Sequence, residues 1–232
     1  MTQFTRVIID PRHRHARWAM LSLERLHAIV ARANDPEWLG APHALWRLDE
    51  GRGGAPSRLY IVSERIPDSR VLFAEFGAGP QSIATCEYEP FLDGHAAGQE
   101  WAFRLKANPT RSEPSGVLGC RGKRTGLTKM DDQLEWLYRQ ARKAGFHMPI
   151  NRLEMPEVMV RESRKIDFAR QDSTVTFVSA VYDGILAVDD PDLLRAALTT
   201  GIGRAKGYGF GLLTLVPVSR NLSEAAANGR RV

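Results

Sequence analysis

The order of the periodic segments limits the possible folds of this chain more than any other feature of its sequence. In the first half, four segments rich in β-branched or alternating apolar residues are predicted to be strands, and two further segments to be helices. The strands are expected at 4–10, 44–48, 58–62 and 99–107, and the helices at 14–33 and 68–76. Strand, helix, strand, strand, helix, strand is the order of a ferredoxin-like domain.

The second half roughly repeats this order of elements without repeating the sequence. A helix is predicted at 130–144, strands at 157–161 and 175–188, a helix at 191–198, and a last strand at 210–218. We therefore predict an α+β fold of two tandem ferredoxin-like (RRM-like) domains with antiparallel sheets, spanning 1–110 and 111–218. Residues 219–232 are polar, small and basic, and are expected to form a disordered tail.

Composition narrows the class of protein. With 232 residues, 43% hydrophobic and 25% charged, the chain can bury a core as one large domain or two small ones. Its net charge of +5 mildly favours an anionic partner. Two cysteines, Cys86 and Cys120, cannot form a disulfide framework or a four-cysteine zinc site. Since we find neither a leader nor a membrane-spanning apolar run, we expect a soluble, cytoplasmic protein without a membrane partner.

A glycine-rich loop, residues 201–211, lies between the last predicted helix and the last predicted strand. It holds five glycines, more than a turn requires, and two cations, Arg204 and Lys206. The glycines are Gly201, Gly203, Gly207, Gly209 and Gly211. Exposed peptide N–H groups beside cations suit phosphate oxygens, but the spacing does not match a Walker A loop. The alternative is a glycine-rich turn with solvated cations.

Cations also gather in two other segments. The first segment, residues 104–124, has six cations and one acid, Glu113. The second is a predicted hairpin. The cations of interest are Arg104, Lys106, Lys123 and Arg124 in the first segment, and Arg161, Arg164 and Lys165 in the hairpin. Such groups fit a surface that follows a nucleic-acid backbone. For any one group alone, solvated loops of a basic protein are the better explanation, and it is the combination of these groups with the glycine-rich loop that favours nucleic acid.

Among the histidines, His27 is the candidate for a catalytic role. It lies beside the apolar stripe of the first predicted helix, and an imidazole can move protons near neutral pH. A lone histidine on a helix flank is more often structural, so the residues alone leave both roles open. His13 and His15 have no third metal ligand nearby, and no metal site or nucleophile elbow is predicted elsewhere.

Several short motifs, in this order along the chain, resemble one family. They are residues 6–9, the pair Leu26-His27, residues 45–48, residues 103–109, Lys123-Arg124 ahead of 134–137, and the glycine-rich loop running into Leu212-Leu213. The chain is similar over nearly its whole length to the CasE family, the CRISPR RNA-processing endoribonucleases of the type I-E Cascade complex. That family has two tandem ferredoxin-like domains, in agreement with the predicted order of elements.

The resemblance implies a function and a chemistry. It implies that CRISPR precursor RNA is cut beside the repeat hairpin by attack of a 2′-hydroxyl on the adjacent phosphorus. The products would carry a cyclic phosphate and a 5′-hydroxyl, and neither a metal nor another cofactor would be needed. The implied partners are the repeat hairpin, whose product is retained, and other Cascade subunits, with no DNA contact by this chain alone.

The resemblance also assigns residues. It implies that His27 is the catalytic histidine, that Arg32 stabilises the phosphate, and that Arg161, Arg164 and Lys165 dock along the RNA stem. It further implies that the glycine-rich loop with Lys206 packs against the first helix. The chain departs from the family at Glu24, where family members carry a tyrosine three residues before the histidine. A carboxylate there could raise the pKa of His27.

Two other functions stay open at this point. The Glu24 departure is consistent with an RNA-hairpin-binding subunit of the same complex that does not cleave. A regulatory protein that binds a small phosphorylated ligand at the glycine-rich loop is a third reading. Incubation of the protein with a hairpin RNA separates the first two, and nucleotide binding without RNA affinity would favour the third.

Overall fold

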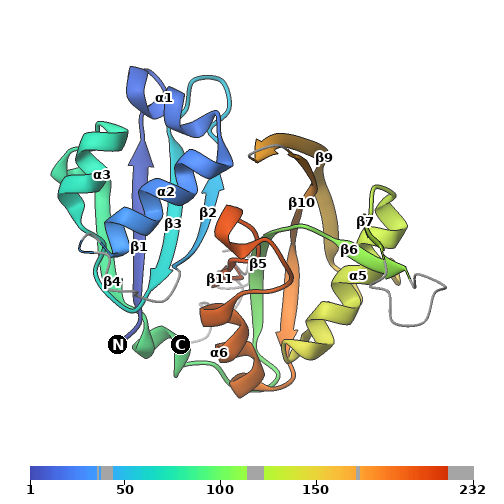
Figure 1. Cartoon of the computed structure of the whole chain (residues 1–232). Helices are drawn as coiled ribbons and strands as arrows, with labels where there is room; N and C mark the ends of the chain where they lie inside the picture. The colour runs from blue at the N-terminus through green and yellow to red at the C-terminus, as the bar shows by residue number, and fades with distance from the viewer. Residues whose placement is uncertain (36, 38–43, 114–122, 171–172, 219–232) are drawn as a thin grey trace, which may run out of the picture.

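The computed structural model describes residues 1–35, 37, 44–113, 123–170 and 173–218. Its architecture is α+β, with two large antiparallel sheets that each carry their own helices, and a small two-stranded sheet (Figure 1). The predicted tail, residues 219–232, and Cys120 lie outside the described residues. No helix among the described residues combines the length and the apolar character needed to cross a membrane.

The first sheet has the strand order β2-β3-β1-β4, and all of its neighbouring strands are antiparallel. Its strands are β1 (Gln3–Ile9), β2 (Leu45–Asp49), β3 (Ser57–Ser63) and β4 (Ile83–Glu87). The helices α1 (Arg14–Met20), α2 (Leu23–Asn34) and α3 (Ser69–Phe76) belong to the same domain. Val7 and Ile61 of the sheet share a buried core with Leu26 of α2 and Leu72 of α3. The sheet has the ferredoxin-like strand order expected from the sequence.

The second sheet has the order β11-β5-β10, with β8 and β9 both paired to β10. Its strands are β5 (Glu100–Ala107), β8 (Phe146–His147), β9 (Val158–Arg170), β10 (Ser173–Val188) and β11 (Leu213–Pro217). Helices α5 (Met130–Lys143) and α6 (Pro191–Thr200) share a core with these strands through Leu137 and Leu198. The short pieces are α4 (Glu89–Leu92), β6 (Thr110–Glu113), β7 (Lys123–Gly126), η1 (Pro80–Ser82) and η2 (Lys206–Tyr208).

One strand lies in a different sheet from the one that the sequence suggested. We expected 99–107 to complete the first sheet, but β5 pairs with β10 and β11, and β4 forms the edge of the first sheet instead. The residues of β4 are mostly exposed, so the strand carries no strong apolar pattern. We therefore propose that the domain boundary lies between α4 and β5 rather than at residue 110.

The predicted helix 14–33 is two helices. Ser22 adopts an extended conformation with φ of −141°, and its hydroxyl accepts a hydrogen bond from the backbone N–H of Arg25. Serine is a favoured residue at a helix N-terminus because its oxygen satisfies one of the free N–H groups there. This cap starts α2 at Leu23 and sets the direction in which His27 projects.

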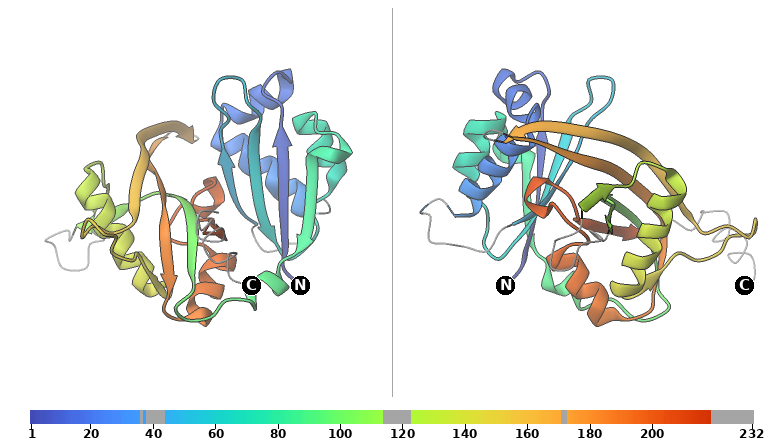
Figure 2. Two further views of the ribbon diagram at one scale, coloured as in Figure 1. Left: turned by 180° about the vertical axis from the view of Figure 1, so that it is seen from behind. Right: turned by 45° about the vertical axis from the view of Figure 1, so that its right-hand side comes forward.

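The long hairpin of β9 and β10 extends from the second sheet toward the helices of the first domain, as Figure 2 shows. Its two strands are antiparallel, with Lys165 opposite Val178 and Arg164 opposite Ser179. This arrangement confirms the predicted hairpin, which we call the basic hairpin after Arg161, Arg164 and Lys165.

Candidate active site

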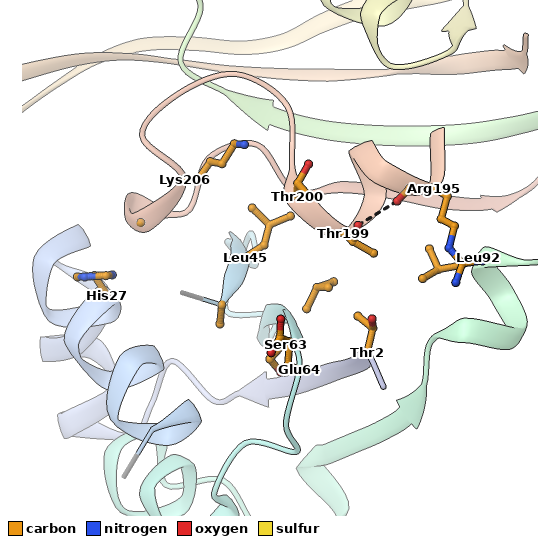
Figure 3. A pocket seen from close by; sticks show the side chains of 13 residues that line it. Thr2, His27, Leu45, Ser63, Glu64, Leu92, Arg195, Thr199, Thr200 and Lys206 are labelled. Carbon is orange, nitrogen blue, oxygen red and sulfur yellow. Dashed lines mark hydrogen bonds between the residues drawn. The ribbon is translucent and has the colours of Figure 1, made fainter. Parts of the chain in front are cut away.

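His27 lies on the flank of α2, half-buried, next to the stripe that faces the core. Leu26, Ile29 and Val30 form that stripe and are almost completely buried. Since neighbouring residues on a helix are 100° apart, burial of Leu26 directs His27 to the side of the helix. The imidazole therefore projects toward the second domain rather than into the core (Figure 3).

The glycine-rich loop packs against α2 at His27. A Cβ atom built on Gly207 would lie 3.5 Å from Cε1 and 3.6 Å from Nδ1 of the imidazole. The carbonyl of Gly207 accepts a hydrogen bond of 3.2 Å from Nε1 of Trp46, on β2. This contact joins residues that are 161 positions apart in the sequence. The expected packing of the loop against the helix is confirmed.

Trp46 also explains part of the glycine content. At Gly209, where φ is +79°, an added Cβ atom would lie 2.5 Å from the indole of Trp46. At Gly203, φ is +81° and the indole of Trp136 would lie 2.9 Å away. Both positions combine a left-handed backbone with a close aromatic neighbour, which glycine alone tolerates without strain. These two glycines serve packing, and Gly207 is the member of the loop that meets His27.

Arg47, on the opposite face of β2, contacts the residues that follow the glycine-rich loop. Its side chain is 2% exposed, and it donates hydrogen bonds to the carbonyls of Leu212 (3.0 Å) and Arg104 (2.9 Å). Its Nε pairs with Asp49 at 2.8 Å, and its Nη2 donates to Thr214. Since consecutive strand residues face opposite sides, Trp46 and Arg47 hold residues 207–214 from both faces of one edge strand. This clasp positions the glycine-rich loop.

A cavity of about 760 Å³ opens beside His27 between the two domains. His27, Gly207 and Lys206 line one end, and Figure 3 shows Thr2, Leu92 and Arg195 at the other. Partial burial lowers the pKa of the Lys206 ammonium, because desolvation disfavours its charged form. An imidazole and an amine therefore share one half-enclosed space, a combination suited to proton transfer and anion binding.

The ring of Tyr208 also lies close to the imidazole of His27. The two ring centroids are 6.0 Å apart, and the phenol ring also lies 5.3 Å from the ring of Phe177 on β10. This contact brings the outer part of the basic hairpin, where Phe177 pairs with Ile166, next to the imidazole. Glu24, which occupies the position of the family tyrosine, is exposed in the first turn of α2. The loop thus supplies a phenol-bearing side chain beside His27 that the helix lacks.

Arg32 is not part of this arrangement. Five residues along the helix turn its side chain by about 140° beyond one full turn from that of His27. Arg32 forms an ion pair with Glu75 of α3, and Nδ1 of His15 lies 3.4 Å from the same carboxylate. The structure therefore places Arg32 on the α3 side of the helix, and we leave it out of the candidate site.

The cations of the basic hairpin are exposed. Arg161 is 47% and Arg164 is 51% exposed, and Lys165 is also on the surface. Arg164 pairs with Glu50 at 2.7 Å, and Arg161 lies 3.5 Å from Asp183. Exposed ion pairs of this kind are weak and readily exchanged, so these side chains can contact a polyanion.

Arg104 and Lys106, which were predicted to bind RNA, both lie on β5. Lys106 is only 6% exposed, and its Nζ is 3.5 Å from the carbonyl of Leu48. Arg104 is held at 2.7 Å by Asp183 and lies 3.6 Å from Asp49. Lys106 is therefore committed to the interface between the two sheets, whereas Arg104 is 40% exposed and lines a cavity together with Arg161 of the basic hairpin. The burial of Lys106 argues against a contact with RNA, and Arg104 stays a predicted RNA contact.

Three other predicted cations remain accessible. Lys123, Arg124 and Arg204 are exposed, and the last two line one cavity of about 320 Å³ together with Gly203. Arg124 belongs to β7 and Arg204 to the glycine-rich loop, so the fold joins two of the basic segments that the sequence separates.

Sequence reasoning missed Arg47 and Tyr208. A charge inside the apolar strand 44–48 and a tyrosine among glycines were the available signals.

Comparisons with known proteins agree with this geometry. A family model described as "CRISPR associated protein" matches residues 3–217. The CRISPR-associated endoribonuclease Cse3 of Thermus thermophilus is 27% identical over 220 residues, covering 92% of this chain and 99% of that protein. The CRISPR system Cascade subunit CasE of Escherichia coli is 30% identical over 204 residues, covering 82% of this chain and 97% of that protein.

Solved structures show the same architecture. Thermus thermophilus Cse3, bound to an RNA that represents a pre-cleavage complex, aligns with a TM-score of 0.77 and 25% identity. That alignment covers 93% of this chain and 99% of the other. Cas6e of Escherichia coli has the same fold, with a TM-score of 0.57. The chain therefore belongs to the CRISPR associated protein family, within the CasE group of type I-E systems.

Proposed function

We propose that this protein is an endoribonuclease that cuts CRISPR precursor RNA beside the repeat hairpin and keeps the product as a Cascade subunit. The observation that carries the proposal is the position of His27, which meets the glycine-rich loop and shares a cavity with Lys206. The names of the relatives support it, since one is an endoribonuclease and another a Cascade subunit. A transcript is the substrate, and we place the protein in the cytoplasm.

The proposed reaction needs no water and no metal. A 2′-hydroxyl oxygen attacks the adjacent phosphorus, the bond from phosphorus to the 5′-oxygen breaks, and a cyclic phosphate and a 5′-hydroxyl result. One proton leaves the 2′-hydroxyl and one reaches the 5′-oxygen, and the imidazole of His27 takes part in this exchange. Lys206 stabilises the charge that grows on the phosphate oxygens, an effect that a half-enclosed site strengthens.

The RNA stem is proposed to lie along the basic hairpin. Duplex RNA is recognised mainly through phosphates, hydroxyl groups and shape, which exposed arginines on a curved strand pair can follow. Arg161, Arg164 and Lys165 form this surface, and Lys123, Arg124 and Arg204 extend it beside the second cavity. The contact of Phe177 with Tyr208 places the hairpin next to His27, so a bound stem ends near the reacting groups.

His27→Ala tests the chemistry. We expect this variant to bind the repeat hairpin with unchanged affinity and to cut it at least about 100-fold more slowly, because general acid–base catalysis contributes that much. Cleavage by the unchanged protein should persist in EDTA. His147→Ala is the matched control, since His147 is exposed on β8 and paired with Asp189 in the other domain.

Three outcomes would reject the proposal. Undiminished cleavage by His27→Ala would remove the histidine from the mechanism. Loss of wild-type cleavage in EDTA would point to a metal-dependent reaction. A wild-type protein that binds the hairpin and never cuts it would be the non-cleaving subunit.

A further inference from the structure

We propose that the cavity beyond His27 and Lys206 binds the base of the first unpaired nucleotide next to the cut. This inference rests on the proposed function and deepens it. At about 760 Å³ the cavity is far larger than one phosphate group needs, and it falls in the range of ligand sites of about 300–1,000 Å³. It continues from the reacting groups along the domain interface to Thr2 and Arg195 (Figure 3).

The position of the cavity relative to the basic hairpin assigns the strand that enters it. Tyr208 and Phe177 connect one side of His27 to the hairpin, where the stem is proposed to lie. Gly207 and Lys206 connect His27 to the cavity. An RNA whose scissile phosphate meets the imidazole therefore has its duplex on the hairpin side. The unpaired chain on the other side of the cut is led into the cavity.

The middle of the cavity suits a base. Leu45 and Val62, from neighbouring strands of the first sheet, line it and give it an apolar wall. A nucleobase has apolar faces and can be removed from its stack for a few kcal/mol, least when it is unpaired. Stacking or packing of one base against protein is worth about 10-fold or more in affinity. A sugar–phosphate chain would gain nothing from these side chains.

The polar groups around this wall present acceptors. Three hydroxyl groups already use their only proton on backbone carbonyls: Ser63 donates to Arg65 (2.8 Å), Thr199 to Arg195 (3.1 Å) and Thr200 to Ala196 (2.8 Å). A hydroxyl that has donated its proton can only accept. The carboxylate of Glu64 adds a further acceptor. The cavity therefore favours a base that offers an exocyclic amino group, as adenine, cytosine and guanine do.

The charges of the cavity set the orientation of the nucleotide. Lys206 lies at the end with His27, whereas Arg195 at the far end is paired with Asp93 of the loop after α4. The negative Glu64 lies beside Ser63, away from His27, and repels a phosphate (Figure 3). The backbone therefore stays at the Lys206 end, next to the reacting groups, and the base extends inward.

The experiment is a single-turnover cleavage assay with three hairpin RNAs that differ only in the first unpaired nucleotide. That nucleotide is adenosine, uridine or an abasic ribose. We expect the wild-type protein to cut the abasic RNA about 10-fold more slowly than the adenosine RNA, from the loss of one bound base. Uridine, which has no amino group, should fall between the two.

Thr199→Phe fills the cavity without touching the reacting groups. We expect it to cut the adenosine RNA about 10-fold more slowly than wild type, and to cut the adenosine and abasic RNAs equally well. Thr199→Val keeps the shape and removes one of the four acceptors, so it should keep the preference for adenosine over the abasic RNA and weaken that for adenosine over uridine. The cleaved hairpin lacks the unpaired nucleotide beyond the cut, so all variants should bind it with the affinity of the wild type.

Two results would overturn the inference. One is a wild-type protein that cuts all three RNAs at the same rate, and the other is a folded Thr199→Phe variant that still prefers adenosine to the abasic ribose. Thermal unfolding of each variant shows whether it is folded. Both results leave the proposed cleavage intact, because cleavage itself is judged by His27→Ala.

Discussion

Two groups of cations in this protein look alike in the sequence and differ completely in the fold. Arg47 and Lys106 lie between the two sheets, where Arg47 is 2% and Lys106 is 6% exposed. Arg161, Arg164 and Lys165 lie on β9 and face solvent. Both groups lie on strands. The face that each strand presents to the other domain decides which cations are structural and which can meet RNA.

The difference has an energetic meaning. A buried guanidinium such as Arg47 has exchanged water for carbonyl and carboxylate oxygens, and its removal leaves those acceptors unpaired. An exposed arginine such as Arg164 keeps most of its hydration, and its surface pair contributes little to stability. Substitutions in the first group should therefore change unfolding, and those in the second should change RNA affinity.

The largest effect is expected for Arg47→Met. Without the guanidinium, the carbonyls of Leu212 and Arg104 and the carboxylate of Asp49 lose a hydrogen-bond donor. We therefore expect a loss of about 3–5 kcal/mol in the free energy of unfolding. Urea titration followed by tryptophan fluorescence measures it. Arg164→Ala is the control and should change the same quantity by less than about 0.5 kcal/mol. Equal losses in the two variants would erase the distinction between the groups.

The double variant Arg161→Ala with Arg164→Ala should have the next largest effect, on binding. Each arginine that contacts a phosphate releases counterions, so the slope of log affinity against log salt should fall by about one per residue, or about two in all. Filter binding of the repeat hairpin across a salt series measures this. Lys143→Ala, which removes an exposed cation from the last turn of α5, is the matched control. A salt slope identical to wild type would move the RNA to another surface.

Lys106→Met should have the smallest effect and a characteristic pH dependence. Burial lowers the pKa of Lys106 below 10.5, so the folded protein holds fewer protons than the unfolded chain between those two pKa values. The free energy of unfolding of the wild type should therefore rise with pH in this window and level off above 10.5. The variant should lack this rise.

At neutral pH, Lys106→Met should be as stable as wild type or more stable by about 1 kcal/mol, because an apolar side chain needs no hydration in the interface. Its RNA affinity and salt slope should not change. Denaturant titrations from pH 7 upward and the salt series above provide both measurements. A salt slope reduced by one in this variant would show that Lys106 meets RNA after all.

Much of the fold could be predicted because local patterns report local structure. The steps of three and four in Leu23, Leu26 and Val30 predicted a helix, and the position of His27 on its flank followed from the same pattern. The break at Ser22 was missed, because the amphipathic spacing continues across it. The strand β4 was also missed. Its residues face solvent, and its place is set by pairing with β1, including a hydroxyl contact of 2.9 Å between Thr5 and Thr85.

The candidate site was only partly predictable. The resemblance to the CasE family named His27 and the glycine-rich loop, and the structure brings Gly207 to the imidazole. The same resemblance assigned Arg32 to the phosphate, whereas in the structure its side chain pairs with Glu75 of α3. Tyr208 was not assigned a role, because its contact with His27 crosses from one domain to the other.

The sequence by itself determined the types and order of most of the elements, the flank position of His27 on its helix, and the glycine content of the loop. These depend on neighbours within a few residues, and such interactions are written in the local pattern. Only the tertiary structure decided which cations are buried, which glycine meets the imidazole and where a cavity remains. Those outcomes depend on contacts such as that of Trp46 with Gly207, 161 residues apart, which form only when both domains have packed.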